Sequence, residues 1–284
     1  MTEMAFDPID PHKTQDEFRN YKDSARQRRV EDFYNQQHRL QTYSFVKEMQ
    51  RKHLALDKGE MSVWEALEYL DSVVDDSDPD TNLSQIQHAL QSAEAVRREY
   101  PGEEHEWLQL VALLHDLGKL LAVTDEKRGL VGEPQWAVVG DTFPVGCKFE
   151  EASNVFPEFF KENPDSSDPV YSSELGIYSP KCGFSSMDFS FGHDEYLYQV
   201  FVRNGCKLPP QALYMIRFHS FYPWHKHGGY KQFADDFDME MLPWLKSFNK
   251  FDLYSKADDL PNRAELETYY KKLIDKYFPA KLKW

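Results

Sequence analysis

The sequence predicts an all-α fold, and three observations lead to that prediction. Apolar residues recur at spacings of three and four along several segments, which is typical of one face of a helix. Capping patterns and prolines stand where several of these segments begin. No segment alternates apolar and polar residues over the length of a strand, and no internal repeat is present. We therefore expect one domain over residues 1–284, with a loose lead-in over 1–17, an N-terminal helical extension and a core from about 60 to 278.

Composition supports a globular protein and excludes several classes of partner. Hydrophobic residues make up 41% of the 284 residues and aromatic residues 15%, which suffices for a sizeable core. Acidic residues outnumber basic ones by 48 to 33, and this balance argues against nucleic acid and anionic membranes as partners. The three cysteines lie far apart, so we expect reduced thiols in a cytoplasmic protein. No signal peptide and no membrane span are visible, and we expect a monomer.

Most of the predicted helices have a recognisable start or end. Ser62 and Glu65 form a capping box, and Pro209 and Pro210 begin a helix in the C-terminal half. Gly205 ends the helix that precedes these prolines. The segments expected to be helical are residues 30–49, 62–74, 84–98, 110–123, 193–205, 209–220, 239–248, 251–256 and 262–278.

Two long stretches between these helices are expected to be loops. Residues 132–147 are rich in glycine and proline, which indicates a structured loop, and such loops often shape ligand sites. Residues 150–190 hold many serines, prolines and aspartates, so we expect surface loops with short helical turns. Residues 124–131 are charged and are expected to be a surface connection.

An acidic run at 75–80 follows the second predicted helix and allows three interpretations. The simplest is a solvated turn stopped by Pro79. A calcium loop fails, because its sixth position is Thr81 instead of glycine and its twelfth is Gln87 instead of glutamate. The third interpretation is a polar lip that accepts hydrogen bonds from a hydroxylated ligand.

The segment 110–123 is apolar around nearly its whole circumference, which predicts a buried helix. It nevertheless carries His115, Asp116 and Lys119. Burying ionisable groups is costly unless they are compensated, and a metal ion is the simplest compensation for an imidazole beside a carboxylate. The plainer alternative is a core histidine with an aspartate partner, and for one such pair alone it is favoured.

Four further side chains make a metal site more plausible than that alternative. His88, His193, His219 and Asp252 each belong to a different predicted helix or helix end and stand in apolar sequence. Together with His115 and Asp116 they suit iron, manganese or zinc better than copper(I) or calcium. Six side chains are too many for one catalytic metal with an open position. We therefore predict a dinuclear site in which Asp116 bridges two ions.

Other candidates receive structural explanations. Asp194 and Glu195 fall in the first turn of a helix, where the helix dipole favours carboxylates. His225 and His227 precede two glycines and are interpreted as loop residues. Arg19 is most simply a surface residue.

The order of the candidate ligands resembles the HD-domain superfamily, whose helical bundle binds one or two metals. The flanking residues resemble the myo-inositol oxygenase family more closely, over the chain from about residue 18 to the C-terminus. The charged insert at 124–131 departs from the usual shorter link. The motifs that carry this resemblance are LLHDLGK at 113–119, GEPQWAVVGDTFPVGC at 132–147, GHDEYLYQV at 192–200, MIRFHSFYPWH at 215–225 and NKFDLYSK at 249–256.

The resemblance implies an HD-domain-like helical bundle that forms a single catalytic domain and holds two iron ions, Fe(II) and Fe(III). It implies cleavage of myo-inositol by dioxygen, between carbons 1 and 6, to give D-glucuronate. One iron is then held by His88, His115, Asp116 and Asp252, and the other by Asp116, His193 and His219. Asp116 and Lys119 are the implied catalytic residues. The implied substrate contacts are Arg19, Asp75, Asp76, Ser77, Lys119, Gly140, Asp141, His219 and Ser220.

Two alternative functions remain open at this stage. Most HD-type proteins are metal-dependent phosphohydrolases, whose sites need several cations near the metals. Here the candidate site residues include two cations, Lys119 and Arg19, against several acidic groups. Repulsion by the acidic groups disfavours binding of a phosphate monoester. The second alternative is a scaffold protein with a structural metal. Such a site needs only about four ligands, so the six candidate ligands weigh against it.

Overall fold

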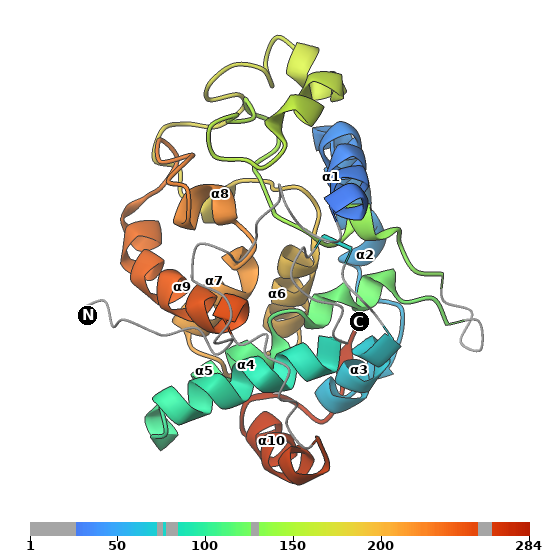
Figure 1. Ribbon diagram of the computed structural model, residues 1–284, viewed down its shortest axis with the longest axis vertical. Helices are drawn as coiled ribbons and strands as arrows, with labels where there is room; N and C mark the ends of the chain where they lie inside the picture. The colour runs from blue at the N-terminus through green and yellow to red at the C-terminus, as the bar shows by residue number, and fades with distance from the viewer. Residues whose placement is uncertain (1–26, 73–75, 78–84, 126–130, 255–262) are drawn as a thin grey trace.

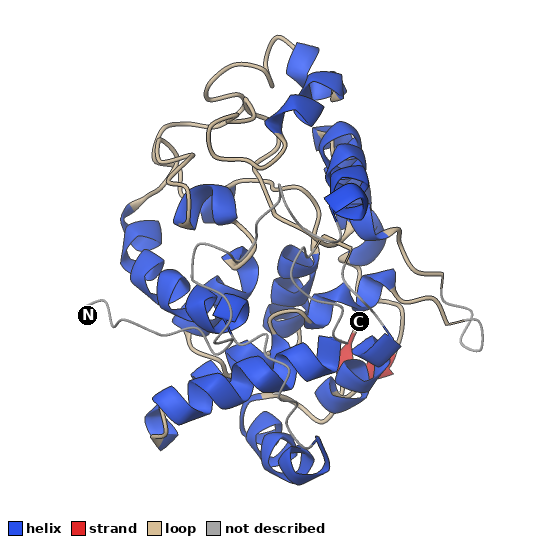
Figure 2. Cartoon of the chain, viewed as in Figure 1, coloured by secondary structure: helices blue, strands red, loops and turns tan. Residues whose placement is uncertain are grey.

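The computed structural model describes residues 27–72, 76–77, 85–125, 131–254 and 263–284. Within these residues the regular secondary structure is helical, apart from one two-stranded sheet, and loops connect the helices (Figures 1 and 2). The prediction of an all-α fold is therefore confirmed. The expected lead-in over 1–17 lies outside the described residues. No described helix is both long enough and apolar enough to cross a membrane.

Ten α-helices in the described part of the chain are joined by short 3-10 turns and loops. The sheet pairs β1 (Glu60–Met61) with β2 (Leu282–Lys283) in antiparallel register, so the C-terminus returns to the N-terminal half. The α-helices are α1 (Gln27–Leu40), α2 (Tyr43–His53), α3 (Val63–Tyr69), α4 (Gln85–Glu99), α5 (Glu106–Leu114), α6 (His193–Arg203), α7 (Pro210–Phe218), α8 (Tyr222–His225), α9 (Asp236–Tyr254) and α10 (Arg263–Tyr277).

The predicted single helix over 30–49 is wrong, because the chain breaks between α1 and α2. Thr42 caps α2 by accepting a hydrogen bond from the backbone N–H of Phe45. Gln41, which is fully buried, donates its side-chain amide to the carbonyl of Phe191 and accepts the N–H of the same residue. In an unbroken helix Gln41 would continue the helical path. The break between α1 and α2 instead lets its side chain bond Phe191 and so link α1 to the segment that leads into α6.

The predicted continuous helix over 110–123 is also wrong, although its burial is confirmed. Helix α5 ends at Leu114, His115 caps it, and a 3-10 turn over Leu117–Ala122 follows. Gly118 lies so close to the start of α6 that an added Cβ would meet the carbonyl oxygen of His193 at 2.1 Å. The turn thereby brings the residues after α5 against the first residue of α6.

Helices α4, α9 and α10 pack around α5, α6 and α7. Helix α4 lies along α5, α6 packs on α7, and α9 covers α7, while α10 lies beneath α5 (Figure 1). The segments 239–248 and 251–256 were predicted as separate helices, but residues 239–248 and 251–254 belong to the single helix α9. Residues 255 and 256 lie outside the described residues. Pro243 lies inside this helix.

The two long stretches predicted as loops are confirmed, whereas residues 126–130 of the predicted charged connection lie outside the described residues. Residues 132–147 form a loop with one 3-10 turn, Gln135–Ala137. Pro144 in this loop forms an isolated antiparallel β-bridge with Phe189. Residues 150–190 contain three 3-10 turns, Pro157–Glu162, Pro164–Ser167 and Phe184–Ser186. The capping box at Ser62 and Glu65 is confirmed as well.

Candidate metal centre

The six predicted ligands converge at the centre of the helical bundle, although they come from five separate places in the chain. Each is at most 7% exposed. His115 and Asp116 occupy the break after α5, His193 is the first residue of α6, and His219 caps α7. His88 lies on α4 and Asp252 near the end of α9.

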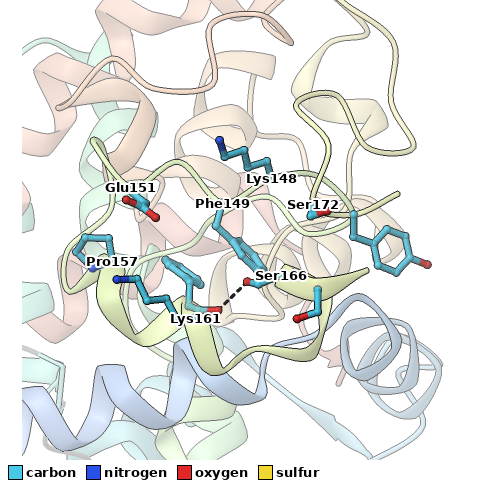
Figure 3. A pocket seen from close by; sticks show the side chains of 10 residues that line it. Lys148, Phe149, Glu151, Pro157, Lys161, Ser166 and Ser172 are labelled. Atoms are coloured by element: carbon cyan, nitrogen blue, oxygen red, sulfur yellow. Dashed lines mark hydrogen bonds between the residues drawn. The ribbon is translucent and has the colours of Figure 1, made fainter. Parts of the chain in front are cut away.

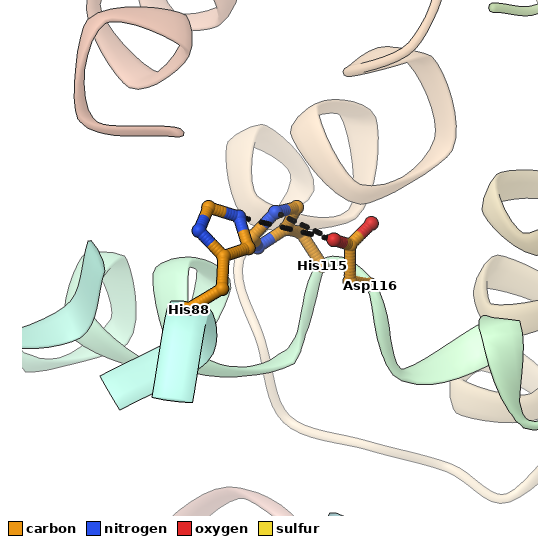
Figure 4. A group of neighbouring side chains, drawn as sticks. All are labelled: His88, His115 and Asp116. Atoms are coloured by element: carbon orange, nitrogen blue, oxygen red, sulfur yellow. Dashed lines mark ion pairs between the residues drawn. The ribbon is translucent and has the colours of Figure 1, made fainter. Parts of the chain in front are cut away.

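One cluster, here called the first group, contains His88, His115, Asp116 and Asp252. Figure 4 shows the two imidazoles facing the Asp116 carboxylate. The Nε2 atoms of His88 and His115 lie 3.9 and 3.5 Å from Asp116 Oδ2. They lie 3.0 and 3.2 Å from Asp252 Oδ1. Two carboxylates and two imidazole nitrogens therefore surround one position.

The other cluster, here called the second group, contains Asp116, His193 and His219. The Nε2 atoms of the two histidines lie 3.2 and 3.5 Å from Asp116 Oδ1, and 3.1 Å from each other. The two oxygens of Asp116 thus face different groups: Oδ2 faces the first and Oδ1 the second. This arrangement is the one that a bridging carboxylate requires.

Backbone carbonyls orient three of the histidines. The Nδ1 atoms of His115, His193 and His219 lie 3.0, 3.2 and 2.9 Å from the carbonyl oxygens of residues 112, 138 and 216. A carbonyl has no proton to donate, so Nδ1 carries the proton and Nε2 presents its lone pair to the centre. Two such lone pairs 3.1 Å apart need a cation or a proton between them. The donor set therefore fits metal ions.

The charges of the buried ligands depend on one another. Burial favours the neutral form of Asp116, but Lys119 and His115 outweigh it and hold its pKa well below the usual value. Burial likewise opposes ionisation of Asp252, and His115 and His88 keep its pKa well below the usual value. Burial lowers the pKa of His219, yet Asp194 and Asp116 raise it to about 9. Without metal, a proton on His219 compensates these carboxylates.

Lys119 brings a buried cation to the bridge. Its side chain is 8% exposed, and Nζ lies 2.7 Å from Asp116 Oδ2. Lys119 lies in the 3-10 turn and Asp116 directly precedes that turn. The end of α5 at Leu114 therefore makes this contact possible. Lys119 is placed where it can also donate to a ligand bound at the bridge.

Three predicted substrate contacts lie beside the second group. Ser220 Oγ is 3.4 Å from His193 Nε2, and the Ser220 carbonyl accepts the N–H of Thr142 at 2.9 Å. This bond brings the Gly140–Asp141 segment to the centre. Gly140 has φ +87°, and an added Cβ would lie 2.6 Å from the Phe33 ring, so both conformation and space require glycine there.

Polar contacts place Asp141 and Asp76, and residues 75 and 78–80 of the acidic run lie outside the described residues. Asp141 is 4% exposed and accepts a hydrogen bond from Tyr34 Oη at 3.0 Å. Asp76 donates its backbone N–H to the Gln135 side chain at 2.8 Å and pairs with Arg29, while Ser77 is buried. Arg19 and Asp75 lie outside the described residues, so their predicted contacts stay predictions.

Sequence reasoning missed the residues that support the ligands from outside. Tyr222 Oη donates to Asp252 Oδ2 at 3.1 Å, and His225 Nε2 donates to the His219 carbonyl at 2.9 Å. The loop interpretation of His225 is wrong, because this residue is buried and ends the short helix α8. No spacing pattern signals either contact, because both depend on how α8 packs against α7 and α9.

A separate surface hollow takes no part in this centre. Its volume is about 310 Å³, and the stacked rings of Phe149 and Phe160, 4.3 Å apart, form part of its wall (Figure 3). It contains none of the six ligands. Its lining residues are Lys148, Phe149, Glu151, Pro157, Phe160, Lys161, Ser166, Ser167, Tyr171 and Ser172.

Replacing Tyr222 with phenylalanine tests the outer support of the first group. Loss of the hydrogen bond to Asp252 should weaken metal binding there about tenfold, as removal of such supports does elsewhere. Competition with a chelator measures this affinity. Tyr214→Phe is the matched control, because Tyr214 is also buried and bonds an aspartate, Asp238, outside the centre. Equal affinities in the two variants would contradict the supporting role.

The pKa of His219 predicts pH-dependent metal binding. Since this pKa is raised to about 9, an ion entering the second group at neutral pH must displace one proton. The apparent binding constant should rise about tenfold per pH unit between pH 7 and 9 and level off above. Titration with Zn(II), with a pH indicator that counts released protons, measures this. Binding that does not change over that range excludes the displaced proton.

Comparisons with known proteins agree with the geometry. A family model described as myo-inositol oxygenase matches residues 27–284. An inositol oxygenase of Dictyostelium discoideum is 50% identical over 273 residues, which cover 96% of this chain and 91% of that protein. Inositol oxygenase 2 of Arabidopsis thaliana is 50% identical (99% and 87% covered), and inositol oxygenase of Mus musculus is 49% identical (97% and 94%). The chain therefore belongs to the myo-inositol oxygenase family.

Proposed function

We propose that this chain cleaves the ring of myo-inositol with dioxygen, between carbons 1 and 6, and releases D-glucuronate. The observation that carries the proposal is the pair of buried ligand groups that share Asp116. Relatives that cover nearly the whole chain at about 50% identity are named inositol oxygenases, which supports this reaction.

The proposed cofactor is a pair of iron ions, one in each group, in the Fe(II) and Fe(III) states. His88, His115, Asp116 and Asp252 would hold the first ion, and Asp116, His193 and His219 the second. Such ions supply dioxygen activation and Lewis acidity, which no side chain provides. The convergence of the imidazole lone pairs on two positions supports the count of two.

The remaining residues would bind and orient the polyol. Two adjacent hydroxyls of myo-inositol would lie at the second group, beside His219 and Ser220. Lys119 would donate a hydrogen bond to a substrate hydroxyl from its position at the bridge. Asp141, held by Tyr34, would accept one, and Gly140 leaves the space for this loop. Arg19, Asp75, Asp76 and Ser77 complete the proposed contacts.

Burial serves this chemistry in two ways. Because the ligands are almost inaccessible, the site excludes bulk water and strengthens each charge interaction. A closed site also limits the escape of reactive oxygen species. We further propose that residues 1–284 act as a single catalytic domain, as a monomer in the cytoplasm.

Oxygen consumption distinguishes this function from the phosphohydrolase alternative. The iron-loaded protein is incubated with myo-inositol, and oxygen uptake and D-glucuronate are measured together. We expect both. Absence of oxygen uptake, combined with hydrolysis of a phosphate ester, would instead favour the phosphohydrolase. The buried surroundings argue against that outcome, because Asp116, Asp141 and Asp252 outnumber the single buried lysine in the described part of the chain.

Replacing Asp116 with asparagine should remove the second iron and abolish oxygen uptake. A neutral amide bridges two cations poorly, and the second group then retains only two imidazoles. Iron per chain is measured by elemental analysis after gel filtration. The control, Asp188→Asn, alters a carboxylate that pairs with Lys47 and should leave the iron content unchanged. Two irons in the Asp116 variant would refute the bridge.

Replacing Lys119 with methionine should separate binding of metal from turnover. Methionine keeps much of the side-chain volume but removes the ammonium group next to Asp116. We expect both irons to remain and kcat/KM for myo-inositol to fall about 100-fold or more. Lys47→Met removes a surface lysine and serves as control. Unchanged kinetics would remove Lys119 from the reaction.

A further inference from the structure

The carboxylate of Asp194 is buried near the second group, yet neither the proposed ligands nor the proposed substrate contacts include it. It is 1% exposed. The structural explanation given from the sequence holds for the next residue, Glu195. Its carboxylate pairs with Arg217 at 2.6 Å and accepts a hydrogen bond from the side-chain amide of Gln199. Asp194 instead turns into the protein, where an uncompensated charge is strongly unfavourable.

Asp194 contacts the residues that form one side of the second group. Its Oδ2 accepts the backbone N–H of Ser220 at 3.1 Å and lies 3.7 Å from His219 Nδ1. Its Oδ1 lies 3.0 Å from His193 Nε2. One side chain thus joins the start of α6 to the end of α7, and it holds the backbone of Ser220, a proposed substrate contact that directly follows the proposed ligand His219.

The two groups differ in charge unless Asp194 is counted. The first group has Asp252 in addition to the shared Asp116, whereas the second group has Asp116 and two imidazoles. In the part of the chain that the structure describes, the ion-pair partners of Asp194 are His193 and His219. Both histidines carry Nδ1 protons directed at carbonyls, so each is neutral once it binds metal through Nε2. The charge of Asp194 then faces the ion.

We propose that Asp194 is a positioning residue that fixes His219 and Ser220, and that its charge stabilises the trivalent state of the ion in the second group. This inference rests on the proposed function for the presence of iron there. With Asp194, each ion has two carboxylates nearby. A unit charge within several ångströms in a buried site changes the equilibrium between Fe(III) and Fe(II) substantially, because screening by water is weak.

Three substitutions separate positioning from charge. Asp194→Asn keeps an oxygen that can accept the Ser220 N–H but removes the charge. Asp194→Glu keeps the charge but displaces the oxygen. Glu195→Gln is the matched control, since it neutralises the adjacent carboxylate on the same helix turn, which faces Arg217. The measurements are iron per chain, the one-electron midpoint potential followed by electron paramagnetic resonance with small-molecule mediators as electron donors and acceptors, and the dissociation constant of myo-inositol.

In Asp194→Asn we expect two irons and a higher midpoint potential, so that at fixed potential the Fe(III)/Fe(II) ratio falls about tenfold or more. Asp194→Glu should keep a potential close to that of the unmodified protein but bind myo-inositol more weakly. Glu195→Gln should match the unmodified protein in all three measurements.

A potential in Asp194→Asn equal to that of Glu195→Gln would overturn the proposal, and so would a shift of the same size in Asp194→Glu. If Asp194→Asn does not fold, the Glu variant decides, because a merely structural carboxylate would leave myo-inositol affinity unchanged once the protein folds. None of these measurements needs turnover. Failure of the proposed reaction would appear separately, as an absence of oxygen uptake by the unmodified protein.

Discussion

The shared carboxylate of Asp116 is the interaction on which the rest of the centre depends. Its two oxygens face two different sets of imidazoles, and both sets are almost completely buried. A buried carboxylate needs positive charge or hydrogen-bond donors to compensate it, and Lys119 and, without metal, a protonated His219 supply the positive charge at Asp116. Helices α4, α5, α6, α7 and α9 therefore enclose a position that the apolar core alone would not stabilise.

Departures from regular helix produce the geometry. The chain leaves α-helical geometry after Leu114, which places His115 and Asp116 at a helix end and directs Lys119 back toward the carboxylate. Gly118 permits the contact between this turn and the start of α6, since any side chain there would collide with the backbone. The break before α2 similarly frees Gln41 to bond the segment preceding α6. These irregular positions set where the ligands stand.

A second layer of hydrogen bonds determines which ring nitrogen faces the metal. Three carbonyls fix the Nδ1 protons of His115, His193 and His219, and Tyr222 fixes Asp252. Because these bonds fix the ring orientations in advance, an ion would meet ring nitrogens already directed toward it, and apart from loss of the proton from His219 little reorganisation would accompany binding. Such a carbonyl contact does not by itself mark a ligand, because His38 Nδ1 also lies 3.2 Å from the carbonyl oxygen of Phe156. Burial lowers the pKa of His38 to about 3, and its ring stacks on Phe160, so it is a neutral core residue.

The sequence by itself determined the helical class, most helix starts and the identity of the six converging side chains, because these follow from periodicity, capping and the occurrence of His and Asp in apolar sequence. Tertiary structure alone decided the breaks after Leu40 and Leu114, the continuity of α9, and the inward direction of Asp194. Local propensity favours helix on both sides of each break, and a carboxylate in a first helical turn satisfies the dipole whether it faces water or protein. Only contacts with distant segments, such as Ser220 beside Asp194, select between those outcomes.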